Sequence, residues 1–474
     1  MSVVLRGGRL GLGGRASDVR IENGTVTAVG PSGSLDAAEV VSLGDATVLP
    51  GLVDGHVHVE QWVRHRRSVD LSAVAGPAEA ARVLRAQAPP AGQWLSGRDI
   101  VPALWSDPPH KRFLDDALRD VPVVVRSIDL HTTWFNSAGL SLVGLAGHPT
   151  GVLRETESIE ANHRLSELTP AAEVDGWIAE ALAELPSLGL TGLIDLEFSD
   201  NLAAWRRRAT PPVRVHAGIW TPWLDAAIAE GRRTGDVVAD RVRVGPYKIV
   251  SDGSLNTRTA WCADPYPDES FGLCLVPADQ LETLMRKAWA AGLVPAIHAI
   301  GDRANTSVLD VFERIGCTGR IEHAQLVSLS DVPRFASLGV VASVQPQHAV
   351  TDRDVADRLW AGRTDRAFAY RTLHDAGARL ELGSDAPVSP LDPWQAVADA
   401  VHRSDDGRPA WHPEQALPLD VAITAACAGR ASVEVGAVAD LTVVAGDLRS
   451  ASEEALRSTT VLATLVGGDV TYQR

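Results

Sequence analysis

The stretch Val48-Leu-Pro-Gly-Leu-Val-Asp-Gly-His-Val-His-Val-Glu60 decides the fold that we expect for this chain. If Leu52 to Val59 forms a strand, His56 and His58 share one face, because side chains two residues apart on a strand point the same way. Neutral imidazole is a common zinc ligand, and a rigid strand fixes the separation of two of them. The same spacing also fits two hydrogen-bonded histidines in a protein core. Which interpretation holds depends on whether later strands supply further metal ligands.

From Val48 to about Ala428, strand patterns alternate with amphipathic helix patterns such as Asp279 to Ala291, which indicates βαβ units and a parallel sheet. A closed (β/α)8 barrel of the TIM type needs eight strands. Nine segments have the strand pattern: Leu52 to Val59, Val121 to Ile128, Thr191 to Leu196, Val213 to Gly218, Tyr247 to Ser251, Val294 to His298, Arg320 to His323, Val340 to Val344 and Leu380 to Ser384. We assign Val121 to Ile128 to an insertion, because the roughly 125 residues before Pro186 far exceed an ordinary loop.

Both ends of the chain carry short strand patterns that are too few to bury two faces alone. The first end holds Val3 to Arg6, Asp18 to Ile21, Thr25 to Val29 and Val40 to Leu43, with a hairpin turn at Glu22-Asn23-Gly24; the second holds Ala439 to Ala445 and Thr460 to Val466. We therefore expect one small β-sandwich built from both termini. The predicted domains are 1–50 (first part of the sandwich), 51–60 (first barrel strand), 61–185 (inserted subdomain that caps the substrate), 186–428 (rest of the barrel) and 429–474 (second part of the sandwich).

Composition limits the classes of partner. The chain has 474 residues, 45% hydrophobic and 22% charged, which is typical of a globular protein with a large core. A formal charge of −16 argues against nucleic acid and against an anionic membrane surface, since both require a basic face. Four cysteines without metal or redox spacing, and no signal-peptide pattern, predict a cytoplasmic protein. A homodimer is the default expectation for its assembly.

Polar residues follow several of the predicted barrel strands: His56, His58, Lys248, His298, His323 and Asp385. Each has an ordinary alternative, since Lys248 fits a rim lysine, His298 a buried hydrogen-bonded histidine and Asp385 a turn residue. In barrels of this type, the strand ends and the following loops meet at one mouth. Four histidines, a lysine and an aspartate gathered there are the residue types that a two-metal hydrolytic centre needs.

These residues lie in ordered blocks: Leu49 to His58, Lys248 to Ser254, His298 to Asp302, Arg320 to Gln325, Ser343 to His348, Gly383 to Val388 and Gly436 to Leu441. The blocks resemble the amidohydrolase superfamily, and more closely its family 3 branch, which includes N-substituted formamide deformylases. The resemblance implies that His56 and His58 bind the more buried metal and His298 and His323 the more exposed one. It also implies that Lys248 bridges both as a carbamate and that Asp385 binds the first metal and transfers protons. Asn256-Thr257 departs from the glycine and serine common in the family, and the C-terminal tail is shorter.

The predicted reaction is metal-dependent hydrolysis of a carbon–nitrogen bond in a non-peptide amide, most simply an N-acyl or N-formyl amine. The expected cofactors are two divalent ions, zinc first, with iron, manganese and nickel also suited to these ligands, and carbon dioxide as the lysine carbamate. Ester hydrolysis, cyclic-amide opening and decarboxylation are alternatives on the same scaffold. A non-catalytic relative that uses the barrel for assembly is a further alternative.

Substrate contacts are expected from loops and from the insertion, because loops on a rigid scaffold carry specificity. The candidates are Arg258, His348, His131, Asn136, Arg154, Glu155 and His216, the last at the end of the third strand. His348 is equally suited to supporting a ligand from behind. Trp134 and Phe135, beside these candidates, are predicted to be core residues.

Overall fold

The computed structural model describes residues 2–90 and 93–474. The chain divides into two compact units, one formed by Met1–Val59 with Ala179–Arg474 and the other by Glu60–Ile178. We call the first the barrel unit and the second the insertion, and each is described by itself. Helix α6 (Ala171–Leu182) runs across the boundary between them. Within the described part of the chain, no helix is both long and apolar enough to cross a membrane.

The barrel unit contains the predicted eight parallel strands. In sheet order they are β19 (Leu380–Leu382), β18 (Val340–Val344), β17 (Gly319–His323), β16 (Pro295–Ala299), β15 (Val242–Val250), β13 (Arg214–Trp220), β12 (Leu190–Asp195) and β6 (Leu52–Val57), with β14 (Val237–Ala239) antiparallel to β15. The last and first strands approach each other, because the Asp385 amide donates to the His56 carbonyl at 2.7 Å and the His58 amide donates to the Ala386 carbonyl at 2.8 Å. The (β/α)8 barrel is therefore confirmed.

Helices connect the barrel strands as the sequence predicts. They are α7 (Asn201–Arg207), α8 (Thr221–Ala229), α9 (Ala278–Ala290), α10 (Asp302–Ile315), α11 (Val332–Leu338), α12 (Pro346–Thr351), α13 (Arg353–Leu359), α14 (Tyr370–Asp375), α15 (Pro393–His402) and α16 (Leu419–Ala426). Short 3-10 turns cover Leu185–Leu188, Thr364–Arg366, Pro413–Gln415 and Leu448–Ser450. Helix α10 illustrates the pattern: Val308, Leu309 and Phe312 are buried at helical spacing, and Gly316 ends the helix with φ 67°.

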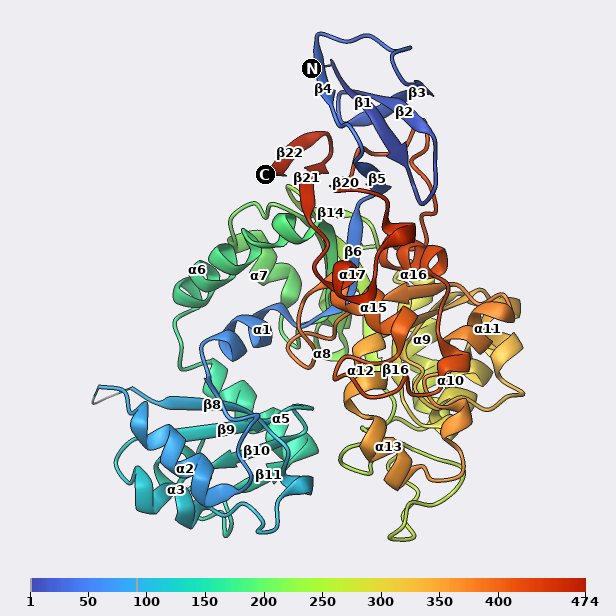
Figure 1. The fold of residues 1–474 in the computed structure, drawn as a ribbon. Coiled ribbons are helices and arrows are strands. Elements are labelled where there is room, and N and C mark those ends of the chain that lie inside the picture. The colour runs from blue at the N-terminus through green and yellow to red at the C-terminus, as the bar shows by residue number, and fades with distance from the viewer. Residues whose placement is uncertain (1, 91–92) are drawn as a thin grey trace. The chain divides into compact units, whose positions relative to one another are not determined.

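The two ends of the chain form one sheet, visible in Figure 1 as blue and red strands side by side. Its strands are β1 (Ser2–Leu10), β2 (Ala16–Glu22), β3 (Thr25–Pro31), β4 (Glu39–Ser42), β5 (Thr47–Pro50), β20 (Leu441–Val444), β21 (Val461–Val466) and β22 (Asp469–Gln473), with α17 (Glu453–Arg457) before β21. Strands β5 and β20 pair antiparallel and join the two halves. Asn23 and Gly24 have φ of 49° and 78°, as the predicted tight hairpin turn requires.

The insertion has its own sheet and core. Its strands, in sheet order, are β11 (Val152–Arg154), β10 (Thr132–Phe135), β9 (Val123–Ser127), β8 (Leu95–Ile100) and β7 (Val69–Asp70). Its helices are α1 (Val59–Arg66, which begins one residue before it), α2 (Pro77–Ala86), α3 (Lys111–Ala117), α4 (Ser137–Leu142) and α5 (Glu155–Ser166), with a 3-10 turn at Pro102–Leu104. Trp134 and Phe135 are fully buried there, so the prediction that they are core residues is confirmed. The ninth predicted strand is β9 of this sheet.

Candidate metal centre

Strand β6 presents two imidazoles to the barrel mouth, the end where the parallel strands finish. His56 is almost fully buried, and its Nε2 lies 3.3 Å from Oδ1 of Asp385. Nε2 of His58 lies at the same distance, 3.3 Å, from the same oxygen. Val57 between them is buried on the opposite side of the strand. The two-residue spacing therefore places both rings on one side, as predicted, and both rings contact the Asp385 carboxylate.

Two glycines allow Asp385 to come this close. A Cβ on Gly55 would lie 2.9 Å from the Leu382 carbonyl oxygen, and a Cβ on Gly383 would lie 2.7 Å from the His56 amide nitrogen. Neither contact is sterically possible for a larger residue without movement of the backbone. Asp385 itself has φ 57°, so the chain turns sharply after β19 and directs the carboxylate toward β6.

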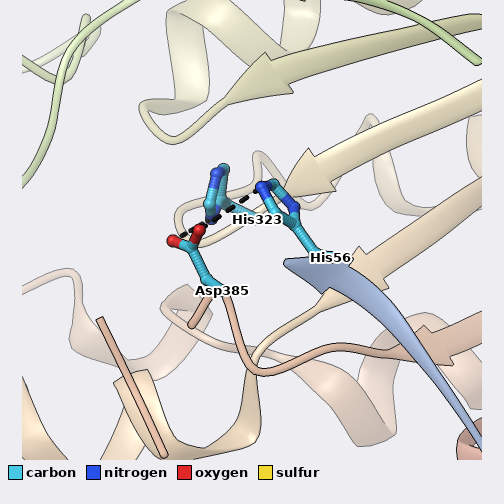
Figure 2. Close-up of side chains that lie close together, drawn as sticks. All are labelled: His56, His323 and Asp385. Atoms are coloured by element: carbon cyan, nitrogen blue, oxygen red, sulfur yellow. Dashed lines mark ion pairs between the residues drawn. The ribbon is translucent and has the colours of Figure 1, made fainter. Parts of the chain in front are cut away.

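The ends of β16 and β17 add two more imidazoles. The rings of His298 and His323 have centroids 4.5 Å apart, and those of His56 and His323 lie 5.0 Å apart. Alternation along β17 would send His323 away from the side of Glu322, but His323 has φ 76° and Ala324 φ 44°. This left-handed turn redirects the ring, and Figure 2 shows His56, His323 and Asp385 pointing toward one another.

Lys248 lies in β15 with 2% of its surface exposed, and its Nζ has no hydrogen-bond partner among the described residues. Burial lowers the pKa of this amine to about 8. A buried amine without a partner destabilises a folded chain, so its retention here calls for a chemical reason.

The charge states of the site suit a cation. Burial, together with the positive charge of Lys248, lowers the pKa of His56 to about 4, and burial with His298 lowers that of His323 well below its usual range. Burial acts to raise the pKa of Asp385, but His56, His58 and His323 together hold it well below its usual range. For His58, burial acts to lower the pKa, but its contact with Asp385 raises it above its usual range. Imidazoles around an ionised carboxylate are the donor set that zinc and similar ions bind.

The buried polar atoms test whether a metal fits. His56, His323 and Asp385 each offer a ligand atom, and these atoms all lie within 4.8 Å of one another. Among the described residues, Nδ1 of His58 and Nδ1 of His323 are buried without a hydrogen-bond partner, as is the Lys248 amine. Three unsatisfied polar atoms at one mouth are what a site built for a cation leaves when only protein atoms are considered. The residues therefore fit a divalent ion.

The other barrel residues singled out from the sequence differ in position. His348 lies near the cluster: its ring is parallel to that of His323 at 6.1 Å, and its Nε2 is 3.9 Å from Asp385 Oδ2. Arg258 is exposed and forms an ion pair with Asp268 at 2.7 Å. Its prediction as a substrate contact has no support from this position.

The position predicted for His216 is wrong. Strand β13 runs from Arg214 to Trp220, so His216 lies near its start rather than at its end. Its register partner is Arg243, whereas Trp220 pairs with Lys248. His216 therefore lies away from the mouth, because the strand continues for four more residues after it, to Trp220.

Four candidates lie in the insertion. Nδ1 of His131 is 2.7 Å from Oε2 of Glu155, and Arg154 is exposed on β11. Asn136 is fully buried and makes four hydrogen bonds: its Oδ1 accepts from the Val123 and Gly139 amides, and its Nδ2 donates to the Leu118 and Val121 carbonyls. These bonds use the whole polar capacity of Asn136 in holding β9 and α4. Substrate binding by His131, Arg154 and Glu155 stays a prediction.

Sequence reasoning missed the polar residues behind the ligands. Glu322 Oε2 lies 2.7 Å from His56 Nδ1, and Arg320 Nε donates to Glu322 Oε1 at 2.5 Å. Asp252 accepts from the Ile300 and Gly301 amides and so holds the loop after β16. The signal was present: Arg320 and Glu322 are two residues apart in a predicted strand, so their side chains share one face.

Fold and cluster together define a (β/α)8-barrel protein with a metal centre of histidine and aspartate at its mouth. The sequence profile of the amidohydrolase family matches residues 39–472, and the chain belongs to that family. Membership implies a hydrolase that uses a divalent metal, for which the cluster supplies the ligands.

Individual relatives match this chain over nearly their whole length. YtcJ of Bacillus subtilis (strain 168), whose name assigns it to the amidohydrolases provisionally, is 28% identical over 98% of this chain and 97% of its own. The N-substituted formamide deformylase of Arthrobacter pascens is 26% identical over 100% and 95%. A solved structure, an uncharacterized metal-dependent hydrolase from Pyrococcus horikoshii OT3, is similar with a TM-score of 0.82 at 26% identity, over 96% of this chain and 99% of that one.

Proposed function

We propose that this protein hydrolyses the carbon–nitrogen bond of a non-peptide amide, an N-acyl or N-formyl amine, with two divalent metal ions at the barrel mouth. One observation carries the proposal: four imidazoles, an amine and a carboxylate converge there, and several of their buried atoms lack hydrogen-bond partners among the described residues. The relative named as a formamide deformylase supports the choice of bond.

We assign the ligands to the two ions as the family resemblance implies. His56 and His58, which share Oδ1 of Asp385, would hold one ion together with that carboxylate. His298 and His323, whose rings lie 4.5 Å apart, would hold the other. Zinc is the ion we expect first, although iron, manganese and nickel suit the same donors. Ions bound there would acidify a water molecule and polarise the substrate carbonyl.

Lys248 would join both ions as a carbamate. Its lowered pKa of about 8 leaves more of the amine neutral at physiological pH than an exposed lysine would have. The neutral Nζ attacks the carbon of carbon dioxide, a nitrogen–carbon bond forms and one proton is released. The product is a carbamate anion with two oxygen donors. Such an anion can bind both metal ions, whereas a protonated lysine would be repelled by them.

Asp385 would move the proton during hydrolysis. Its carboxylate is ionised, lies at the mouth between β6 and β17, and can accept a proton from the attacking water. It then returns that proton to the leaving nitrogen, so that amide and water give a carboxylic acid and an amine. His348, with a buried Nε2 that has no hydrogen-bond partner in the described chain, is the best placed of the substrate-binding candidates.

Metal analysis of wild type beside Lys248→Ala, both expressed with bicarbonate, tests the centre. We expect about two equivalents of divalent metal in the wild type and a clear loss in the variant. Intact mass of the native protein should show one added carbon dioxide, absent from the variant. Equal metal content in both proteins would remove Lys248 from the ligand set.

A substrate panel tests the reaction. N-formyl and N-acyl amines, cyclic imides, carboxylic esters and aromatic acids would be offered in parallel to the metal-loaded enzyme. Turnover of the open-chain amides above the others supports the proposal, and preference for any other class contradicts it. The cytoplasmic location and the homodimer remain predictions, to be tested by fractionation and by light scattering.

A further inference from the structure

A buried row of alternating charges runs through the barrel interior to one metal ligand. Arg379 pairs with Glu381 at 2.6 Å, Glu381 with Arg320 at 3.0 Å, Arg320 with Glu322 at 2.5 Å, and Glu322 with His56 Nδ1 at 2.7 Å. The row begins at a guanidinium that is more than half exposed and ends at a histidine with 1% exposure. Each buried charge in such a row must be paired with an opposite charge, because an unpaired buried charge destabilises the fold.

Sheet register explains why these residues meet. Glu322 of β17 is aligned with Ser343 of β18, and Ser343 with Glu381 of β19, so the three side chains share one face. Arg320 lies two residues before Glu322 and shares that face as well. Its Nη2 donates to the Ser343 hydroxyl at 2.6 Å and to the Gly55 carbonyl at 2.8 Å. Arg320 therefore ties β17 and β18 to β6, next to the metal ligands.

We propose that Glu322, anchored by Arg320, is a positioning residue that sets the tautomer and orientation of His56. A carboxylate held by a guanidinium stays ionised and can only accept hydrogen bonds, so the proton of His56 must lie on Nδ1. The lone pair then lies on Nε2, the atom that faces Asp385 at 3.3 Å. The inference deepens the proposed metal centre and rests on it.

The other ligands differ in their support. Nε2 of His298 lies 3.2 Å from the Gly253 carbonyl oxygen and 3.4 Å from Oδ1 of Asp252. Nδ1 of His58 and Nδ1 of His323 have no hydrogen-bond partner among the described residues. His56, whose Nδ1 lies 2.7 Å from Glu322 Oε2, therefore has the shorter contact to a carboxylate behind its ring. A carboxylate behind a histidine ligand typically changes metal affinity by about 10- to 100-fold. We therefore expect a change of this size when Glu322 loses its contact with His56.

The test compares Glu322→Gln with the matched control Glu381→Gln. Both variants remove one buried carboxylate that pairs with Arg320, but only Glu322 contacts His56. Metal-free proteins would be titrated with zinc in competition with a chromogenic chelator. We expect zinc affinity to fall about 10- to 100-fold in Glu322→Gln, and to stay within about threefold of wild type in Glu381→Gln. Glu322→Asp, which keeps the charge but withdraws it from His56, replaces Glu322→Gln if that variant does not fold.

A second readout is specific for the tautomer. Histidine side-chain 15N spectra of the metal-free protein should give His56 in the Nδ1-protonated form in wild type and in Glu381→Gln, and a mixture of tautomers in Glu322→Gln. Unchanged zinc affinity in Glu322→Gln, or equal weakening in both variants, would overturn the inference alone. A wild type that binds no zinc would overturn the metal centre as well, whereas zinc binding without amide cleavage contradicts only the proposed reaction.

Discussion

The barrel mouth and the insertion use the same residue types in opposite ways. At the mouth, Lys248 Nζ and Nδ1 of His58 and His323 are buried without hydrogen-bond partners among the described residues. In the insertion, His131 meets Glu155 at 2.7 Å, and Asn136 makes four hydrogen bonds. Buried polar groups cost free energy unless they are paired. The contrast indicates that Asn136 stabilises the fold of the insertion, while the unpaired atoms of the mouth suit a bound group.

The largest expected effect is on catalysis at the mouth. Asp385→Asn should lower kcat for the best amide of the panel by about 10²- to 10⁴-fold, because an amide cannot accept and return the proton. Steady-state kinetics with matched metal content measure this loss. A decrease in kcat smaller than about tenfold would assign proton transfer to another group.

The second effect is on stability in the insertion. Asn136→Ala should lower the free energy of unfolding by about 3 kcal/mol, because two buried amides and two carbonyls lose their partner. Urea denaturation measures the loss, and KM at low temperature should be unchanged. A raised KM without lost stability would show that Asn136 binds substrate and would break the comparison.

Metal removal should affect the two regions unequally. If the wild type is saturated at about a hundred times its dissociation constant, chelation costs about 2.7 kcal/mol of stability. Amide hydrogen exchange should accelerate in β6 and β17, which carry His56 and His323, and stay unchanged in β9 and β10 of the insertion. Equal acceleration in both regions would mean that the metal acts outside the mouth.

The smallest expected effect is on the stability of the metal-free protein when Lys248 is replaced. Lys248→Met should leave the stability of the metal-free protein unchanged or raise it by about 1 kcal/mol, because an apolar chain of similar length replaces a buried amine without a partner. Denaturation of chelated wild type and variant measures this difference. A loss above about 2 kcal/mol would mean that the amine has a structural role.

Much of the fold followed from local pattern. Alternating strand and helix periods predict the eight strands, and the surplus segment 121–128 is β9 of the insertion because the connection around it is too long for a loop. Asn23-Gly24 predicts its turn because both positions need positive φ. By contrast, β13 is longer at its end than the pattern predicts, because Ile219 and Trp220 continue the strand without a break in apolar character. That error placed His216 at the wrong end of the strand.

Residue types and their spacing predict which side chains can serve the site. Two-residue spacing puts His56 and His58 on one face, and parallel strands bring their carboxyl ends to a common mouth, so types and order suffice to predict the cluster. The orientation of the ligands, however, depends on how distant segments pack together. The left-handed turn at His323, the close approach allowed by Gly55 and Gly383, and the contact of Glu322 with His56 depend on segments far apart in the chain. No local pattern encodes such contacts, because they form only when the closed barrel brings β6 against β17 and β19.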